Sequence, residues 1–430
     1  MQREKTIAFS TLGCKLNFSE TDAISRNFAN GDYAIVPFNS PADIYVINSC
    51  TVTKNAEKRC KELIRKATNN NPEAHVAVIG CYSEISSKEI ASIPGVSLVL
   101  GNKEKYALHE HLEKLSQNAV MAEPLPDNGD TAPPFVPAYS LDGRTRSFFK
   151  IQDGCDYKCA YCTIPLARGN SRSNSIAKTL EVAREIAKSK IKEIVLTGVN
   201  IGDFGKPHDE TFYELLKELI KTDGLDRIRL SSVEPDLLTN DIIRLVANEP
   251  KLMPHFHIPL QSGSDTVLKK MGRRYDTKLF ADRVDFIRQH IPHACIAADL
   301  IVGYPVETAA LFEESMKFIE KVDVSYLHVF TYSERENTRA VKSAERVHPK
   351  ERKQRSRLMQ ALSSEKKKTF LLSNKGLETS VLWEKDQAGG FMYGFTENYI
   401  RVKRKFDIKK TNTIELVVLN KQDNTGVYFI

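Results

Sequence analysis

Three cysteines at positions 155, 159 and 162 have the spacing of a metal-binding loop. They lie in the run GCDYKCAYC, which is a C-x3-C-x2-C pattern. Zinc is one candidate metal, but structural zinc sites favour paired C-x2-C units that supply four ligands. Three cysteines on a four-iron cluster leave one iron without a protein ligand, and that iron can bind a cofactor or substrate. The run therefore favours an iron–sulfur cluster over zinc or three core cysteines.

Three further cysteines follow apolar runs that look like strands. Cys14 follows TIAFSTLG, Cys50 follows DIYVINS and Cys81 follows HVAVIG. The ends of parallel strands share one edge of a sheet, the edge at which ligands bind. Each cysteine alone is a commonplace buried residue, but the repeated position predicts a second cluster. Cys60 and Cys295 have no comparable partners and are predicted to pack in cores.

The composition is typical of a large globular protein. Of its 430 residues, 41% are hydrophobic and 27% are charged, so the chain can bury large cores, and we expect three domains. The N-terminal residues lack the pattern of a signal peptide, and no apolar run approaches membrane-spanning length. We therefore expect a cytoplasmic protein without membrane association, whose eight cysteines are metal ligands or redox groups rather than a disulfide framework.

Residues 1–116 are predicted to form an α/β domain. Four apolar runs alternate there with amphipathic segments such as 56–69, a pattern typical of a doubly wound parallel sheet. Residues 117–141 contain five prolines in polar sequence and are interpreted as an interdomain linker.

Residues 142–370 contain six more candidate strands. Helices are predicted between most of them, for example at 176–189, 211–221 and 276–290. Six β/α units predict an open, barrel-like parallel sheet, since a complete barrel needs eight. The runs that we predict as strands are FFKIQDG, EIVLTG, RIRLSS, HFHIPL, CIAADLIVG and SYLHVFTY.

Polar residues at the predicted strand ends are candidate contacts for a cofactor or substrate. Asn200 closes the second strand, Glu234 follows the third and Gln261 ends the fourth. Ordinary β-to-α turns and helix caps also favour Ser, Thr, Asn and Gly, which is the alternative interpretation of these segments.

The C-terminal part is basic. Residues 340–410 contain 18 Lys and Arg against 8 Asp and Glu, a balance of +10, whereas the rest of the chain has −3. A charged helix is predicted at 345–370, and the alternating runs of 371–430 predict a small all-β barrel. The charge indicates a nucleic-acid contact, although a solvated helix face has the same appearance.

Rings and cations in the predicted barrel are candidate RNA contacts. Four rings are suited to stacking on bases unless they fill the barrel core: Phe391, Tyr393, Phe395 and Tyr399. The candidate phosphate contacts are Arg401, Lys403, Arg404 and Lys405, with Lys366, Lys367 and Lys368 as weaker candidates.

The C-x3-C-x2-C run, with Tyr161 before its last cysteine, resembles that of the radical S-adenosylmethionine (SAM) superfamily. The resemblance implies a [4Fe-4S] cluster on Cys155, Cys159 and Cys162. Its open iron would bind the methionine part of SAM, and its electron would cleave SAM to a 5′-deoxyadenosyl radical. The superfamily often has two glycines and a glutamate at the end of the second strand, where this chain reads TGVN.

Both cysteine sets together resemble the methylthiotransferases. TLGCKLNFSE, INSC and VIGCYSE are similar to that family's N-terminal cluster domain, and QDGCDYKCAYCTIPLARG is similar to its radical core. The C-terminal segment looks like the family's RNA-binding TRAM domain. TLGCKLN, TGVNIGDFG and LARGNSRS are most similar to the branch that modifies N6-threonylcarbamoyladenosine at position 37 of tRNA.

The resemblance implies that a methylthio group is placed on C2 of the adenine. One SAM would methylate a sulfur on a [4Fe-4S] cluster held by Cys14, Cys50 and Cys81, and a second SAM would supply the radical. The implied partners are tRNA, an electron donor and a sulfur donor, and we expect a monomer. Relatives that modify isopentenyladenosine in tRNA or an aspartate of a ribosomal protein remain alternatives, as does a zinc-stabilised, non-enzymatic RNA-binding protein.

Anaerobically purified protein is predicted to be brown and to contain about eight irons per chain, because two four-iron clusters are expected. Metal analysis and optical absorption measure this directly. A colourless protein with stoichiometric zinc would contradict the enzyme interpretation.

Overall fold

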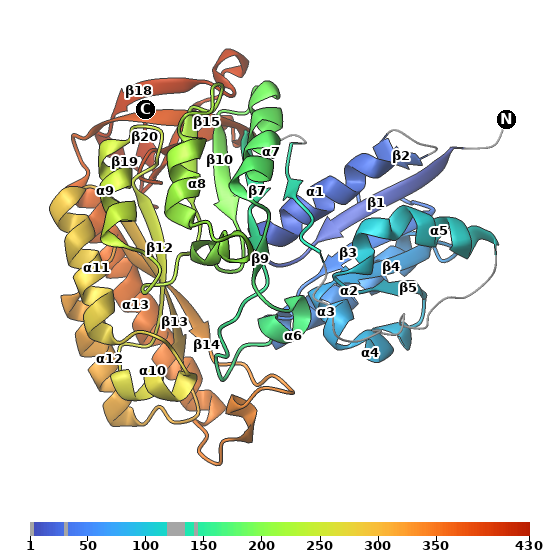
Figure 1. The fold of residues 1–430 in the computed structure, drawn as a ribbon, viewed down its shortest axis with the longest axis horizontal. Coiled ribbons are helices and arrows are strands. Elements are labelled where there is room, and N and C mark those ends of the chain that lie inside the picture. Colours follow the sequence, from blue (N-terminus) through green and yellow to red (C-terminus); the bar gives the residue numbers. More distant parts are fainter. Residues whose placement is uncertain (1–3, 30–32, 118–133, 142–144) are drawn as a thin grey trace.

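The computed structural model describes residues 4–29, 33–117, 134–141 and 145–430. Three parts of different architecture follow one another along the chain (Figure 1). The first two have parallel sheets with helices, and the third is rich in strands. The fold class predicted from the sequence is confirmed. The predicted linker at 117–141 lies mostly outside the described residues.

The N-terminal part has strands and helices in alternation. The strands are β1 (Lys5–Thr11), β2 (Tyr33–Ile35), β3 (Ile44–Ser49), β4 (His75–Gly80) and β5 (Val96–Leu100). The helices are α1 (Lys15–Ala29), α2 (Lys54–Asn70), α3 (Cys81–Ile85), α4 (Ser87–Ala91) and α5 (Leu108–Gln117).

The five strands form one parallel sheet in the order β2-β1-β3-β4-β5. Alternate residues of a strand point to opposite faces, so each face of this sheet has its own core. Val46 and Ile79 pack with α1 and α5, whereas Ile47 and Val78 pack with α2, where Cys60 is fully buried. The sheet is therefore doubly wound, as predicted, and the carboxyl ends of β1, β3 and β4 meet at one edge.

The central part contains these elements. Its strands are β6 (Ala138–Tyr139), β7 (Arg146–Lys150), β8 (Gln152–Asp153), β9 (Arg172–Ser173), β10 (Glu193–Thr197), β11 (Arg227–Leu230), β12 (His255–Gln261), β13 (Cys295–Val302) and β14 (Tyr326–Thr331). Its helices are α6 (Ile164–Arg168), α7 (Ile176–Lys188), α8 (Phe212–Leu219), α9 (Asn240–Asn248), α10 (Asp265–Met271), α11 (Thr277–His290), α12 (Ala309–Lys321) and α13 (Pro349–Ser373).

All six predicted central strands are present and run parallel. They pair as β7-β10-β11 and as β12-β13-β14, and parallel bridges at Ile228–Leu252 and Ser232–His257 connect the two groups. The result is an open partial barrel. β6, from the end of the predicted linker, adds an antiparallel strand beside β7.

Helix starts follow from local sequence. Thr211 and Glu214 form a capping box at the start of α8, and the Asp276 carboxylate accepts the Leu279 N–H at the start of α11. The predicted helix at 345–370 starts later, because Pro349 is its first residue and His348 caps it.

The C-terminal part is a six-stranded sheet in the order β18-β15-β16-β17-β20-β19. Trp383 and Val402 are fully buried in its core, and Cys295 of β13 packs against the same core. The strands are β15 (Glu378–Ala388), β16 (Phe391–Thr396), β17 (Arg401–Lys405), β18 (Ile414–Val418), β19 (Lys421–Gln422) and β20 (Tyr428–Phe429).

Buried arginines fasten the C-terminal sheet to the amino ends of the barrel strands. Arg227 donates to the Ser380 hydroxyl (2.7 Å), and Arg229 donates to the Glu397 carbonyl (2.8 Å). Glu193 lies between them and accepts two hydrogen bonds from Arg229, of 2.8 and 3.1 Å. Burial alone would raise the pKa of Glu193. The charge and hydrogen bonds of the Arg229 guanidinium oppose the effect of burial, and the pKa is lowered to about 2.

Glu193→Gln is predicted to lower the free energy of unfolding by about 3–5 kcal/mol, because it leaves the buried Arg229 charge uncompensated. Urea unfolding followed by the fluorescence of Trp383, the single tryptophan, measures this. The depressed pKa of Glu193 stabilises the native protein above pH ~4.3, and this contribution is lost as the pH falls toward 2.

Glu218→Gln serves as the control, because Glu218 forms only an exposed ion pair with Lys221. Its effect should stay below about 0.5 kcal/mol. Equal effects of the two substitutions would contradict a structural role for Glu193.

Candidate active site

The loop that carries Cys155, Cys159 and Cys162 follows β7 and the short β8, and is held by a tight backbone contact. Gly154 has φ +71°, and a Cβ there would lie 1.9 Å from the Asn170 carbonyl oxygen. The Cys155 N–H donates to the Gly169 carbonyl (3.0 Å). Only glycine fits at position 154, and the turn sets the direction in which the cysteine loop leaves the sheet.

Hydrogen-bond donors surround the three thiols of this loop. The Tyr157 N–H donates to the sulfur of Cys155 (3.4 Å), and the Ile164 N–H donates to that of Cys162 (3.4 Å). Burial raises the pKa of the Cys155 thiol to about 12. A metal that binds here must therefore displace the thiol protons. The N–H groups then donate to negatively charged thiolate sulfurs.

One of the predicted strand-end residues is linked to this loop. Arg273 donates to the sulfur of Cys159 (3.1 Å) and also pairs with Glu234, so the predicted Glu234 is connected to the cysteine loop through one guanidinium. Burial raises the pKa of Glu234 to about 7. Gln261 ends β12 with φ +67°, in the left-handed region, where it turns the chain out of the sheet.

Buried polar atoms at the strand ends lack partners. The Asn200 side chain is 2% exposed, and neither its nitrogen nor its oxygen has a hydrogen-bond partner among the described residues. The Ser231 hydroxyl at the end of β11 is also without one there. An unpaired buried polar group costs about 1–3 kcal/mol, so these atoms fit a site that a polar cofactor such as SAM completes.

Cys14, Cys50 and Cys81 converge at the carboxyl edge of the N-terminal sheet. Gly13 lies so close to Cys50 that a Cβ at position 13 would be 2.9 Å from its sulfur. Burial raises the pKa of Cys50 to about 12, and the nearby Cys81 and Cys14 thiols contribute to the rise. The three strand ends therefore bring these cysteines together, as the repeated pattern predicted.

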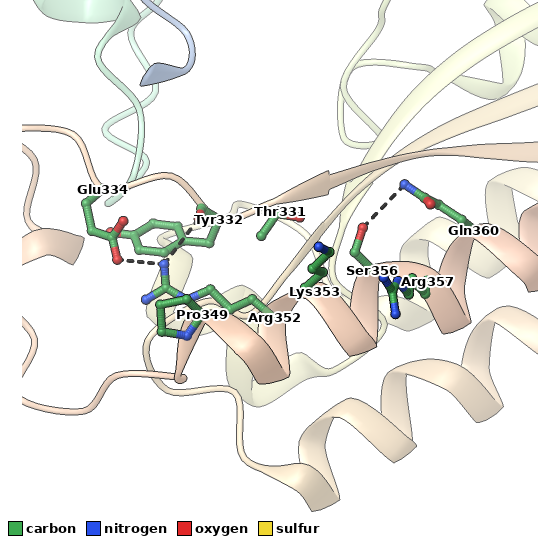
Figure 2. Close-up of a pocket in the computed structure, with 9 residues that line it drawn as sticks. All are labelled: Thr331, Tyr332, Glu334, Pro349, Arg352, Lys353, Ser356, Arg357 and Gln360. Carbon is green, nitrogen blue, oxygen red and sulfur yellow. Dashed lines mark hydrogen bonds and ion pairs between the residues drawn. The ribbon is translucent and has the colours of Figure 1, made fainter. Parts of the chain in front are cut away.

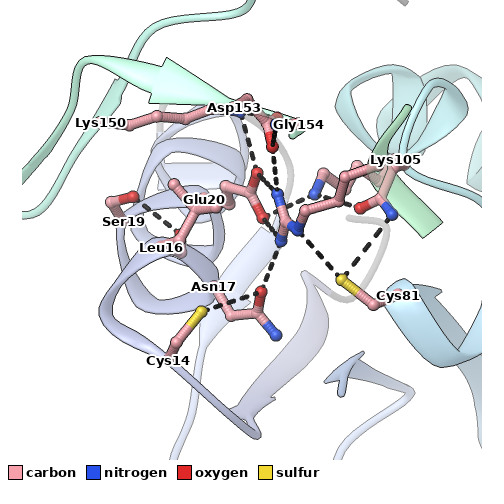
Figure 3. A network of polar contacts seen from close by, with 12 residues as sticks. Cys14, Leu16, Asn17, Ser19, Glu20, Cys81, Lys105, Lys150, Asp153 and Gly154 are labelled. Carbon is pink, nitrogen blue, oxygen red and sulfur yellow. Dashed lines mark hydrogen bonds and ion pairs between the residues drawn. The ribbon is translucent and has the colours of Figure 1, made fainter. Parts of the chain in front are cut away.

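Arg168 of α6 lies between the two cysteine sets. It follows Cys162 by six residues, yet its Nε donates to the sulfur of Cys81 (3.1 Å). Its terminal nitrogens donate to Glu20 (3.0 Å), Asp153 (2.9 Å) and Asn17 (2.7 Å). The Cys14 thiol donates to the Asn17 side-chain oxygen (3.9 Å), so Cys14, Glu20 and Asp153 belong to one network of polar contacts (Figure 3).

The network has an excess of positive charge. The buried Lys105 and Lys150 ammonium groups also pair with Glu20, at 2.6 and 3.0 Å, and Lys150 pairs with Asp153 at 2.7 Å. Arg168 and the mostly buried Arg172 add two more cations, so four cations face two carboxylates. A buried unpaired charge is costly, and a thiolate-bound cluster at Cys81 would supply the missing negative charge.

Neither cysteine set has the spacing of a single-ion site. Three sulfurs bound to one zinc at 2.3 Å lie only about 3.8 Å apart. Among the described residues, only His257, Asp299 and His328 bring three ligand atoms within 4.8 Å of one another. A four-iron cluster takes one cysteine per iron and so needs wider spacing between the sulfurs than a single zinc ion does.

A cavity of about 500 Å³ lies beside Cys14, inside the partial barrel. Its wall comes from all three parts of the chain: the start of α1, the strands of the barrel, and Tyr399 of the C-terminal part. The polar and aromatic lining residues are Cys14, Lys15, Phe18, Phe148, Thr197, Ser231, Ser232, His255, His257, Tyr326, His328 and Tyr399.

A second cavity of about 510 Å³ lies between the end of β14 and the first turns of α13 (Figure 2). Arg352 there pairs with Glu334 at 2.6 Å. Lys353 and Arg357 also line it and form no ion pair with the described residues. This cavity contains no cysteine but offers two cations to an anionic partner.

Two family models match the chain. Residues 6–101 match the family described as Uncharacterized protein family UPF0004, and residues 149–319 match the Radical SAM superfamily. A threonylcarbamoyladenosine tRNA methylthiotransferase of Aquifex aeolicus is 36% identical over 93% of this chain and 96% of its own length. The chain belongs to the methylthiotransferase family. A second methylthiotransferase relative, the tRNA-2-methylthio-N(6)-dimethylallyladenosine synthase of Desulfotalea psychrophila, is 32% identical over 78% of each chain.

A solved structure shows the same type of fold as this methylthiotransferase. It is the radical SAM methyltransferase TsrM of Kitasatospora setae, with a TM-score of 0.54 over 76% of this chain and 72% of that chain, at 13% identity. Radical SAM enzymes use a [4Fe-4S] cluster and SAM, and methylthiotransferases carry two clusters. The chain is accordingly an enzyme with these cofactors.

The predicted RNA contacts of the methylthiotransferase divide into two groups. Arg401 and Lys405 are exposed, and Arg401 lies over the Tyr393 ring at 4.1 Å. Lys403 pairs with Asp423, and Arg404 pairs with Glu415 at 2.7 Å.

Several of the other predicted rings and lysines already make contacts within the protein. Phe395 stacks on Tyr399 with ring centroids 4.6 Å apart, at the junction with the barrel, and Phe391 packs on Phe429. Lys366 donates to the carbonyl of Val322 (2.9 Å), and Lys367 lies 5.9 Å from the ring of Tyr326.

Several residues of the site were not selected from the sequence. Arg168 lies in the same run as the predicted cluster cysteines, and Lys15 directly follows Cys14. Their closeness to a cysteine in the sequence could have identified both as site residues. Glu20 lies six residues after Cys14, so the same signal was available for it, whereas Arg273 is distant from any cysteine in the sequence. The fold brings Glu20 of α1 to Arg168, and brings Arg273, in the turn after α10, to Cys159.

Arg168→Gln is predicted to lower the free energy of unfolding by about 3–5 kcal/mol, because it breaks buried pairs with Glu20 and Asp153. It should also reduce iron loading, since Cys81 loses its nearest donor. Urea unfolding and iron analysis measure the two effects. Arg184→Gln, which changes an exposed residue of α7, should alter neither, and a similar loss in both variants would contradict the role of Arg168.

Proposed function

We propose that this enzyme transfers a methylthio group to C2 of N6-threonylcarbamoyladenosine at position 37 of tRNA. One observation carries the proposal: Arg168, six residues after Cys162, contacts Cys81 of the second cysteine set, and a cavity of about 500 Å³ lies beside Cys14 of that set. The relatives with the greatest coverage act on that nucleoside, which supports it as the substrate.

In this proposal each cysteine set holds one [4Fe-4S] cluster. Cys155, Cys159 and Cys162 bind the cluster that works with SAM, and Cys14, Cys50 and Cys81 bind the second. When bound, the clusters and SAM supply a radical and a methylthio group for an unactivated C–H position. The amide of Asn200, the Glu234 carboxylate and the Gln261 side chain contact SAM, and the donors around each sulfur orient the thiolates.

The tRNA lies across the C-terminal part and α13. Arg401 and Lys405 are exposed and free to contact phosphates, whereas Lys403 and Arg404 mainly secure the sheet through their carboxylate partners. Lys353 and Arg357 extend the basic surface along α13. The C-terminal sheet then acts as a TRAM-type RNA-binding domain.

The enzyme works as a cytoplasmic monomer with external electron and sulfur donors. No helix within the described residues has the length and apolarity needed to cross a bilayer. A reaction on tRNA and oxygen-sensitive clusters both fit a reducing compartment.

Replacing one cysteine set at a time tests the two proposed roles. The triple substitution of Cys155, Cys159 and Cys162 by Ala should abolish formation of 5′-deoxyadenosine, because no cluster remains to reduce SAM. The triple substitution of Cys14, Cys50 and Cys81 should leave 5′-deoxyadenosine formation and end methylthiolation. Chromatography of the reaction and mass spectrometry of tRNA nucleosides measure both products.

Cys60→Ala is the matched control, because Cys60 is buried in the core beneath α2 and belongs to neither set. It should retain both products. Methylthiolation by the N-terminal triple variant would refute the assignment of Cys14, Cys50 and Cys81. The absence of methylthiolated threonylcarbamoyladenosine in tRNA treated with the wild-type enzyme would refute the substrate.

A further inference from the structure

The cavity beside Cys14 has an unusual distribution of charge. Its wall contains one lysine and three histidines, and none of the described residues that line it is acidic. Apolar rings form much of the remaining wall, including Phe18 and Phe148, whose centroids are 6.4 Å apart. A cavity with aromatic walls and a cation but no anion is suited to a flat ligand that carries a negative group.

Lys15 is the cation of this cavity. It begins α1 directly after Cys14, is half-buried, and forms no hydrogen bond or ion pair with the described residues. The other buried lysines are paired, since Lys105 and Lys150 both contact Glu20. The Glu193 carboxylate, which lies behind the cavity, already accepts two hydrogen bonds from Arg229. The Lys15 ammonium is therefore available to an anion that enters from outside.

His255 gives a second, independent indication of a polar ligand. It is 4% exposed, lines the same cavity, and its Nδ1 has no hydrogen-bond partner among the described residues. Its ring packs on Tyr399 with centroids 4.7 Å apart, which fixes its orientation. A buried imidazole nitrogen without a partner is costly unless a bound molecule completes it.

The remaining histidines are held rigidly by their own contacts. The Asp299 carboxylate accepts from His257 (2.7 Å) and His328 (3.0 Å), and Ser232 contacts the second nitrogen of His257 (2.8 Å). Asp299 is thus engaged by the two imidazoles and does not neutralise Lys15.

We propose that this cavity receives the substituted adenosine, with the Lys15 ammonium paired to the carboxylate of its threonylcarbamoyl group. His255 donates or accepts a hydrogen bond on the same substituent, and the adenine lies against the aromatic wall beside Cys14. This inference rests on the proposed function and adds the residues that select the substrate. An isopentenyl substituent carries no charge and would leave Lys15 and His255 unpaired, so the cavity discriminates against it.

The test compares two RNA substrates in steady-state kinetics with the cluster-loaded enzyme. One is an anticodon stem-loop with threonylcarbamoyladenosine at position 37, and the other carries the same group as its uncharged methyl ester. Lys15→Met should raise KM for the acid by about 10–100-fold, the range of a lost charge-assisted hydrogen bond, and change KM for the ester by less than about threefold. Lys15→Arg should restore much of the preference for the acid.

Controls separate binding from cluster integrity. Lys58→Met changes a lysine on α2 whose side chain is 76% exposed, and it should behave as the wild type. Iron content and 5′-deoxyadenosine formation should be unchanged in Lys15→Met. An equal rise in KM for the acid and the ester in Lys15→Met, or a loss of iron from that variant, would overturn the role of Lys15 in recognition.

The outcomes for the wild-type enzyme distinguish the two proposals. If it methylthiolates the acid substrate and Lys15→Met does so with the same KM, only the recognition site is refuted. If it modifies neither RNA but modifies isopentenyladenosine, the proposed substrate is refuted and the recognition site with it. A wild-type preference for the acid that Lys15→Met removes supports both.

Discussion

The guanidinium of Arg168 joins the two cysteine-bearing parts of this enzyme. It comes from the loop of the central cysteines and ends among Cys81, Glu20 and Asn17 of the N-terminal part. Five planar N–H donors allow one side chain to contact several acceptors at fixed angles, which an ammonium group cannot do. Arg168 therefore links the two parts directly, together with Lys150, whose ammonium group also pairs with Glu20.

Burying so many charges is expensive, and the arrangement shows how the cost is offset. Glu20 and Asp153 are each shared by three cations, so every lone pair has a donor. Positive charge still exceeds negative charge until thiolates are formed at Cys14, Cys50 and Cys81. In the proposed arrangement, folding of this interface and loading of the N-terminal cluster are coupled through electrostatics.

The open barrel needs all three parts to become a closed site. α1 packs beside β7, as Figure 1 shows, and places Cys14 and Lys15 at one side of the cavity. The C-terminal sheet closes the amino ends of the strands through Arg229 and contributes Tyr399. A sheet of six strands leaves room for a nucleoside, which the packed interior of a complete eight-stranded barrel does not.

The sequence by itself determined the alternation of strands and helices, the six central strands and both cysteine sets. Those features depend on short-range patterns: hydrophobic periodicity, caps such as Thr211, and cysteines at strand ends. The two cysteine sets could accordingly be found from the sequence. The difference between the exposed Arg401 and Lys405 and the ion-paired Lys403 and Arg404 could not. Both pairs have the same residue types, and only their carboxylate neighbours distinguish them.

The tertiary structure alone decided which distant side chains meet. Glu20, Lys105 and Lys150 come from three separate elements, and each would be expected at the surface if judged by residue type. Lys15 looks in the sequence like an ordinary helix-start residue, and only the enclosure by barrel strands and Tyr399 makes it the charged group of a cavity. Pairing and burial of these charges depend on contacts between residues 85 or more positions apart, which no local pattern in the sequence indicates.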